Sequence, residues 1–195
     1  MEKRCVKSVA VAEDPYRVLF STEDAYPVNF DLLEAEDGSC LVAIIHRNCL
    51  RLVFFPDAAT HSEQRDLELA NVHDPAYKDV LLAVRFGGDA GGERLGVAGE
   101  LGCVYLLEVG GDCATPHLLQ HHSKTVMDLR FVPAQRLVTA SQDHSVALWD
   151  LRRQAVLCKW VATTERLSAA NQALPSTEEG FLLAGYDDAA VRVLD

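Results

Sequence analysis

One short segment recurs along this 195-residue chain, and the recurrence limits the folds that the chain can adopt. Residues 139–150 (TASQDHSVALWD) align without gaps with residues 184–195, at an offset of 45 residues. Residues 97–108 align with the same segment at an offset of 42 residues, and a weaker copy at residues 43–54 lies 54 residues earlier still. Four copies at this spacing indicate an array of small units, each stabilised mainly by its neighbours.

The apolar runs in these copies are short and tend to alternate with polar residues, which is the pattern of a half-buried β-strand. The runs are rich in Val, Leu and aromatic residues and are bounded by Gly, Asp, Asn or Pro. No long segment carries the apolar stripe of a helix, and we expect residues 57–69 and 163–174 to be loops with at most one helical turn. The sequence therefore predicts an all-β chain, and all-β units of roughly 40 to 50 residues predict the blades of a β-propeller.

The charge of the chain argues against some kinds of partner. Lys and Arg together number 18 and Asp and Glu number 29, so the net charge is −11. An acidic surface repels nucleic-acid phosphates and attracts basic peptides, so we expect protein partners and no direct contact with nucleic acid. No apolar run approaches the ~18–20 residues of a membrane span, and the N-terminal residues lack the apolar core of a signal peptide. We therefore expect no membrane contact and a nuclear protein, with a cytoplasmic location as the alternative.

The cysteines, histidines and glycines do not form a recognisable cofactor or metal motif. The six cysteines include no C-x-x-C pair, and free thiols are the expected state in an intracellular chain. His117, His121 and His122 have no Cys or carboxylate at ligand spacing, so we expect no metal site. The Gly-rich run at residues 87–92 lacks the Lys-Ser/Thr of a phosphate loop and predicts a hairpin loop. We expect no cofactor.

The third repeat resembles a repeat of the WD-repeat family. His122 is followed by Val126, Leu129, Phe131 and Pro133, in the order typical of the start of such a repeat. The resemblance implies a buried chain of hydrogen bonds that joins a His before the first strand, a Ser or Thr in the second strand, the turn Asp and the Trp. In this sequence those residues are His122, Ser141 or Thr139, Asp143 and Trp149.

His122 and Asp143 are also the residue types of a catalytic pair, so an enzyme is the competing interpretation. The resemblance already gives both residues a structural role, since a buried carboxylate and a buried indole N–H each need a hydrogen-bond partner. Ser141, Asp143 and His144 lie too close together in one turn to form a nucleophile, a base and an orienting group. We therefore expect no catalytic residue and no enzymatic activity.

A more extended resemblance covers residues 5 to 195. The order and spacing of several segments resemble the Polycomb family called extra sex combs, or embryonic ectoderm development, although each segment alone is weak. The segments are residues 5–8 (CVKS), 24–30 (DAYPVNF), 47–52 (RNCLRL), 95–102 (LGVAGELG), 118–123 (LLQHHS), 141–150 (SQDHSVALWD) and 184–188 (AGYDD). The corresponding repeats are predicted at residues 24–56, 78–109, 118–151 and 156–195, and residues 5–11 correspond to the outer strand of a closing blade.

The Polycomb resemblance implies a non-catalytic chromatin subunit in the nucleus. Its expected partners are a histone methyltransferase subunit and a basic histone tail. The family binds trimethylated lysine in a cage of aromatic side chains, and Tyr26 matches the first cage position. Leu82 stands at the second cage position and has no aromatic face, so Tyr77 is the other candidate. The alternative is a WD-repeat adaptor of another kind, such as a signalling or ubiquitin-ligase scaffold, without methyl-lysine recognition.

The number of repeats is smaller than a WD-repeat ring requires. Such a ring usually closes with seven blades of roughly 40–45 residues each, and this chain supplies about four. We expect a partial propeller whose first and last blades have unpaired strand edges. A truncated product is the favoured explanation, and a half-propeller completed by a further chain is the alternative.

Overall fold

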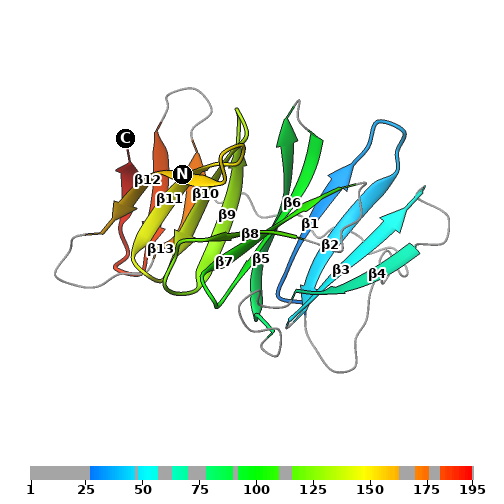
Figure 1. The fold of residues 1–195 in the computed structure, drawn as a ribbon, viewed down its shortest axis with the longest axis horizontal. Helices are drawn as coiled ribbons and strands as arrows, with labels where there is room; N and C mark the ends of the chain where they lie inside the picture. Colours follow the sequence, from blue (N-terminus) through cyan, green and yellow to red (C-terminus); the bar gives the residue numbers. More distant parts are fainter. Residues whose placement is uncertain are drawn as a thin grey trace, which may run out of the picture.

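The computed structural model describes residues 27–46, 48–56, 63–69, 78–89, 92–109, 116–162, 170–175 and 181–194. Within these ranges the chain consists of strands, turns and loops, as Figure 1 shows. The described part of the chain has no helix that is long and apolar enough to cross a membrane. The all-β prediction is confirmed.

The strands form four antiparallel sheets in which strands consecutive in sequence are neighbours. The first sheet contains β1 (Asn29–Glu34), β2 (Cys40–His46), β3 (Cys49–Phe55) and β4 (Glu63–Glu68). The second contains β5 (Leu81–Asp89), β6 (Gly92–Gly99), β7 (Cys103–Glu108) and β8 (His117–Gln120). The third contains β9 (Val126–Val132), β10 (Arg136–Ser141), β11 (Ser145–Asp150) and β12 (Ala155–Val161). The described part of the fourth contains β13 (Ala170–Pro175), β14 (Leu182–Tyr186) and β15 (Val191–Leu194).

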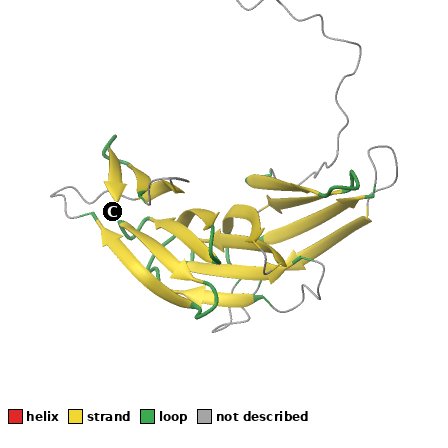
Figure 2. Cartoon of the chain, turned by 90° about the horizontal axis from the view of Figure 1, so that it is seen from above, coloured by secondary structure: helices red, strands yellow, loops and turns green. Residues whose placement is uncertain are grey.

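The four sheets follow one another along an arc, which is visible in Figure 2. The first strands of successive sheets are in contact, β1 with β5, β5 with β9 and β9 with β13. The second strand of each sheet also contacts the first strand of the next sheet. This is the arrangement of propeller blades, in which each sheet packs one face on its neighbour and its first strand lies on the inner side of the ring.

Among the described residues, the core consists of three apolar layers, each between two successive sheets, and a smaller apolar cluster on the first sheet formed by Val42, Ile44, Val53 and Phe55. Side chains alternate along a strand, so one strand serves two layers: Val97 of β6 faces the first sheet and Ala98 faces the third. Ile45 and Leu50 pack into the layer with Val97, and Trp149 packs into the layer with Ala98. Each fully buried Val or Leu in these layers contributes roughly 1.5–3 kcal/mol to folding, so adjacent blades hold one another in place.

Two segments differ from the expectation of loops. Residues 63–68 form β4 and pair with β3, and residues 170–175 form β13 and pair with β14. In β4 the sequence EQRDLE is mostly polar, because this outermost strand has little contact with the apolar layers. It therefore lacks the alternation by which the other strands are recognised. The fourth strand of each complete sheet begins after the repeat predicted for that sheet. Strand β4 lies between two predicted repeats, whereas β8 and β12 coincide with the start of the next one.

The expected hairpin at the Gly-rich run is confirmed, because β5 and β6 pair from Leu81 to Asp89 and from Gly92 to Gly99. Cys40, Cys103 and Cys158 are free thiols, as the sequence indicates. Residues 5–11 lie outside the described residues.

Candidate functional site

The third sheet contains a chain of hydrogen bonds that starts at the indole of Trp149. Trp149 Nε1 donates to Thr139 Oγ1 over 2.9 Å, and Thr139 Oγ1 lies 2.7 Å from His122 Nε2. His122 Nδ1 lies 3.2 and 3.1 Å from the two carboxylate oxygens of Asp143. Ser145 Oγ also donates to Asp143. The segment before β9, the β10–β11 turn and strands β10 and β11 are thus held together by one polar chain.

The direction of two of these hydrogen bonds follows from the groups themselves, because an indole N–H can only donate and a carboxylate can only accept. Trp149 therefore donates to Thr139, and His122 Nδ1 donates to Asp143. This assignment rests on matching each donor to an acceptor. The sequence left open whether Thr139 or Ser141 is the hydroxyl residue of this hydrogen-bond chain, and the structure shows that it is Thr139.

Ser141 lies beside the chain and supports the turn. Its hydroxyl donates to the backbone carbonyl of Lys124 and accepts from the backbone N–H of Asp143. Ser145 is the member that sequence reasoning missed; it directly follows the turn, and its backbone N–H also donates to Asp143. A hydroxyl residue two positions after a turn Asp is the signal that points to it.

Asp143 is held as a carboxylate. Burial on its own raises the pKa of this group, but the hydrogen bonds from His122 and Ser145 outweigh burial and hold the pKa of Asp143 well below its usual range. Lys159 on β12 adds an ion pair at 3.5 Å. The carboxylate therefore acts as a fixed acceptor at the end of the polar chain.

The polar chain is closed to solvent. The side chain of His122 is 0% exposed and that of Asp143 is 6% exposed. Thr139, Ser141 and Ser145 are each fully buried. Every hydroxyl in the chain is engaged, so the geometry supports a structural function for these residues and offers no nucleophile that a substrate can reach.

The second sheet has a different polar contact at the corresponding place. Asp79 is fully buried just before β5, where its carboxylate accepts from Leu101 N at 3.1 Å and from Tyr105 Oη at 3.2 Å. Burial raises the pKa of Asp79, and burial with the nearby Asp79 charge raises the pKa of Tyr105. Gly99 is required here because a Cβ would lie 2.3 Å from the backbone oxygen of Val80 and 2.8 Å from Asp79 Oδ1. The carboxylate thus comes from the segment before the first strand, whereas in the third sheet it comes from the turn.

A second polar cluster joins the inner strands of three sheets. Arg85 of β5 donates to Asn29 of β1 over 2.9 Å and forms an ion pair with Asp128 of β9 at 3.4 Å. Arg130 binds the same carboxylate at 3.3 Å. Asp31 of β1 accepts from the backbone N–H of Phe86 over 2.7 Å. Sequence reasoning missed this cluster; charged residues at alternate positions of an otherwise apolar strand, as in Asp128 and Arg130, are the signal that was present.

The two cage candidates, Tyr26 and Tyr77, lie outside the described residues. Leu82, at the second cage position of the resemblance, is half-buried on β5, and its carbonyl accepts from Asn29 Nδ2 at 3.3 Å. The described residues contain no group of three or more His, Cys, Asp or Glu side chains that could hold a metal ion.

Comparison with solved structures identifies the fold. A chain of an active polycomb repressive complex 2 in the basal state superposes with a TM-score of 0.71 and 14% identity, over 89% of this chain and 38% of that chain. A chain of the ctPRC2 complex with H3K27me3 and H3K27M gives a TM-score of 0.71 and 14% identity, over 87% and 37%. Sqt1 of Chaetomium thermophilum, free or bound to the N-terminus of the ribosomal protein L10, gives 0.65 and 16%, over 84% and 42%.

The four-blade arrangement and these neighbours show that the described residues have the fold of a partial WD-repeat β-propeller. The chain spans about two fifths of the length of the structures that it matches. No family model matches the sequence, and no curated protein matches it. At identities of 14–16% the superposition establishes the fold alone.

Proposed function

We propose that this chain is a non-catalytic interaction scaffold, similar in function to the Polycomb subunit that supports a histone lysine methyltransferase complex and reads methylated histone tails. The observation that carries the proposal is the superposition of 89% of the chain on part of a polycomb repressive complex 2. The ordered segments of the sequence resemblance support the same family. A nuclear location follows from the proposal.

The absence of catalysis is part of the proposal. The residues that most resemble a catalytic set are His122, Asp143 and Ser145. Their side chains are buried and hydrogen-bonded to one another. A hydrolase activity that disappears in His122→Ala, while the circular dichroism spectrum is retained, would contradict this part of the proposal.

A second candidate function is a WD-repeat adaptor without methyl-lysine recognition. It is favoured by Leu82, which lacks the aromatic face that a cage requires. It is also compatible with the second neighbour, Sqt1, which is described as bound to the N-terminus of a ribosomal protein. In both candidates the acidic chain, with its net charge of −11, favours basic peptides.

Peptide titration separates the two candidates. Isothermal titration with a trimethyl-lysine histone peptide and its unmethylated form tests the cage directly. Saturable binding that requires the methyl groups, and that falls at least tenfold in Tyr26→Ala or Tyr77→Ala, is expected from the Polycomb-like function. Equal affinity for both peptides favours the adaptor.

The partner complex needs its own experiment. Affinity purification of the tagged chain from its own cells is expected to recover a SET-domain methyltransferase. The matched control is a chain with Arg153→Gln, an exposed residue outside the polar chain and the cluster on the inner strands, which should recover the same partner. Recovery of other proteins without a methyltransferase contradicts the Polycomb-like function and leaves the adaptor.

A further inference from the structure

A cavity of about 430 Å³ lies between the second and third sheets, beside the inner strands. It is lined by the ends of β5 and β9, the start of β6 and the turns that follow β9 and β11. In the third sheet, Arg136 pairs with Val132 and Asp150, at the opposite end of the strands from Ser141 and Val126. The cavity is therefore at the other end of the blade from the His122–Asp143 chain and separate from it.

Four arginines line this cavity, although the chain as a whole is strongly acidic. They are Arg85, Arg94, Arg130 and Arg136, and Asp31 is the one acidic residue among the described residues of the lining. One oxygen of Asp31 already accepts from Phe86 N. Asp128, which lies behind the wall and is 7% exposed, binds Arg85 and Arg130. Even when Asp128 is counted, the described residues at the cavity include four arginines and two aspartates, so their net charge is positive.

Arg94 and Arg136 have no hydrogen bond or ion pair to any residue in the described part of the chain. Arg94 is half-buried at the start of β6, and Arg136 is exposed at the start of β10. Two guanidinium groups are therefore open to an anion, and a guanidinium binds phosphate through two parallel N–H donors.

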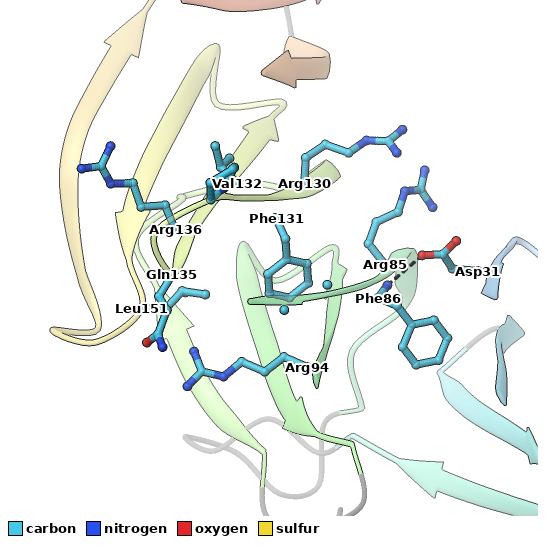
Figure 3. Close-up of a pocket in the computed structure, with 13 residues that line it drawn as sticks. Asp31, Arg85, Phe86, Arg94, Arg130, Phe131, Val132, Gln135, Arg136 and Leu151 are labelled. Carbon is cyan, nitrogen blue, oxygen red and sulfur yellow. Dashed lines mark hydrogen bonds between the residues drawn. The ribbon is translucent and has the colours of Figure 1, made fainter. Parts of the chain in front are cut away.

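The ring of Phe131 lies in the cavity wall among the arginines, as Figure 3 shows. It lies against the backbone of Gly87, where any Cβ would overlap the ring. Figure 3 shows Arg85 and Arg130 on one side of this ring, with Arg94 and Leu151 on another. The positive groups are thus distributed around the cavity, so a ligand that binds them all must have anionic groups on more than one side.

We propose that this cavity is a binding site for a small, multiply phosphorylated molecule, of the size and charge of a sugar or inositol polyphosphate. The volume lies within the range of small-molecule sites, and the arginines supply charge-assisted donors from both sheets. Such a ligand would neutralise the excess charge between the second and third blades and connect them. This site is independent of the histone-tail function proposed above.

The experiment is a calorimetric titration of the full chain with three probes: inositol hexakisphosphate, pyrophosphate and citrate. Inositol hexakisphosphate should bind most tightly, with an affinity that falls at least tenfold in the double variant Arg94→Gln/Arg136→Gln. The control variant Lys124→Gln/Arg153→Gln removes the same charge outside the cavity and should bind as the wild type does. Both variants change side chains that are at least partly exposed, and a thermal melt checks that each is folded.

Three results would overturn the proposal. One is the absence of heat and of any melting shift with inositol hexakisphosphate at ~1 mM, the weak limit of a specific site. Another is an equal loss of affinity in the cavity variant and the control variant, which indicates attraction by general charge. The third is that citrate binds as tightly as the polyphosphate, which indicates a carboxylate ligand. Failure of the histone-peptide titration does not affect any of these readouts.

Discussion

The second and third sheets anchor the segment before their first strand in different ways. In the third sheet a His enters from that segment and meets an Asp of the β10–β11 turn, with Thr139 and Trp149 completing the chain. In the second sheet the acidic group itself enters, as Asp79, and meets a backbone N–H of the turn and the hydroxyl of Tyr105. In both sheets a satisfied polar link joins this segment to the turn or to the strand after it, and the carboxylate of the link comes from the turn in one sheet and from the segment in the other.

The largest effect is expected for Asp143→Ala, which removes the acceptor of four donors in the third sheet: the side chains of His122 and Ser145 and the backbone N–H groups of Ser123 and Ser145. The free energy of unfolding should fall by about 3 kcal/mol, because His122 and Ser145 lose a buried partner. Asp188 aligns with Asp143 but binds the Arg192 side chain near the surface, so Asp188→Ala should cost less than about 1 kcal/mol. Urea denaturation followed by circular dichroism measures both. Equal losses would contradict the difference between the two turns.

The second sheet should be less sensitive, and Tyr105→Phe tests it. This change removes one of the donors to Asp79 and keeps the packing of the ring, so the loss should be about 1.5 kcal/mol. The matched control is Tyr186→Phe in the fourth sheet, whose hydroxyl has no recorded hydrogen bond to the described residues. It should change stability by less than about 0.5 kcal/mol. A loss at Tyr105 no larger than at Tyr186 would show that the Asp79 link contributes little.

The third-sheet link could be predicted from the sequence because one repeat holds the whole set of residue types at the expected spacing. The Asp79 link could not, because Asp79 lies two residues before its strand whereas His122 lies four residues before its own. Its partner Tyr105 also falls two positions before Leu107, the residue aligned with Trp149. Strand periodicity predicts the faces of a strand but not these contacts between separate segments.

The cavity arginines and the outer strand β4 illustrate two further limits. Arg85 and Asp128 are 43 residues apart and meet because β5 and β9 are neighbours on the inner side of the arc. Their contact depends on the register between two sheets, which no local pattern encodes. In β4, the polar residues of an exposed edge strand do not differ in type from those of a loop.

The two links should respond to pH in opposite directions. The folded pKa of Asp143 is lowered below its ordinary value of about 3.9, so its stabilisation is present above that pH and is lost as the pH falls further. The folded pKa of Asp79 is raised by burial, so its contribution is greatest below about pH 3.9 and is lost as the pH rises through the folded pKa.

Urea denaturation of Asp79→Asn between pH 4 and pH 7 measures this difference. The free energy of unfolding of the variant, relative to the wild type, should increase with pH, because the buried charge is removed. Asp143→Asn should show no such increase across the same range. If the difference in free energy of unfolding between Asp79→Asn and the wild type does not change with pH, burial does not raise the pKa of Asp79.

The smallest effect concerns the residue that follows the turn Asp in the third and fourth sheets. His144 and Ala189 both have a left-handed backbone, with φ of 70° and 61°. A residue other than Gly, Asn or Asp is disfavoured there by roughly 1 kcal/mol, so Ala189→Gly should relieve this cost. Gly also increases the entropy of the unfolded chain, and the net gain should be about 0.5 kcal/mol, or roughly 1–2 °C in Tm. Differential scanning calorimetry measures it, with Ala190→Gly as the control outside the left-handed region. If Ala189→Gly lowers Tm as much as the control does, the left-handed turn carries no strain, and the two turns differ only in their Asp contacts.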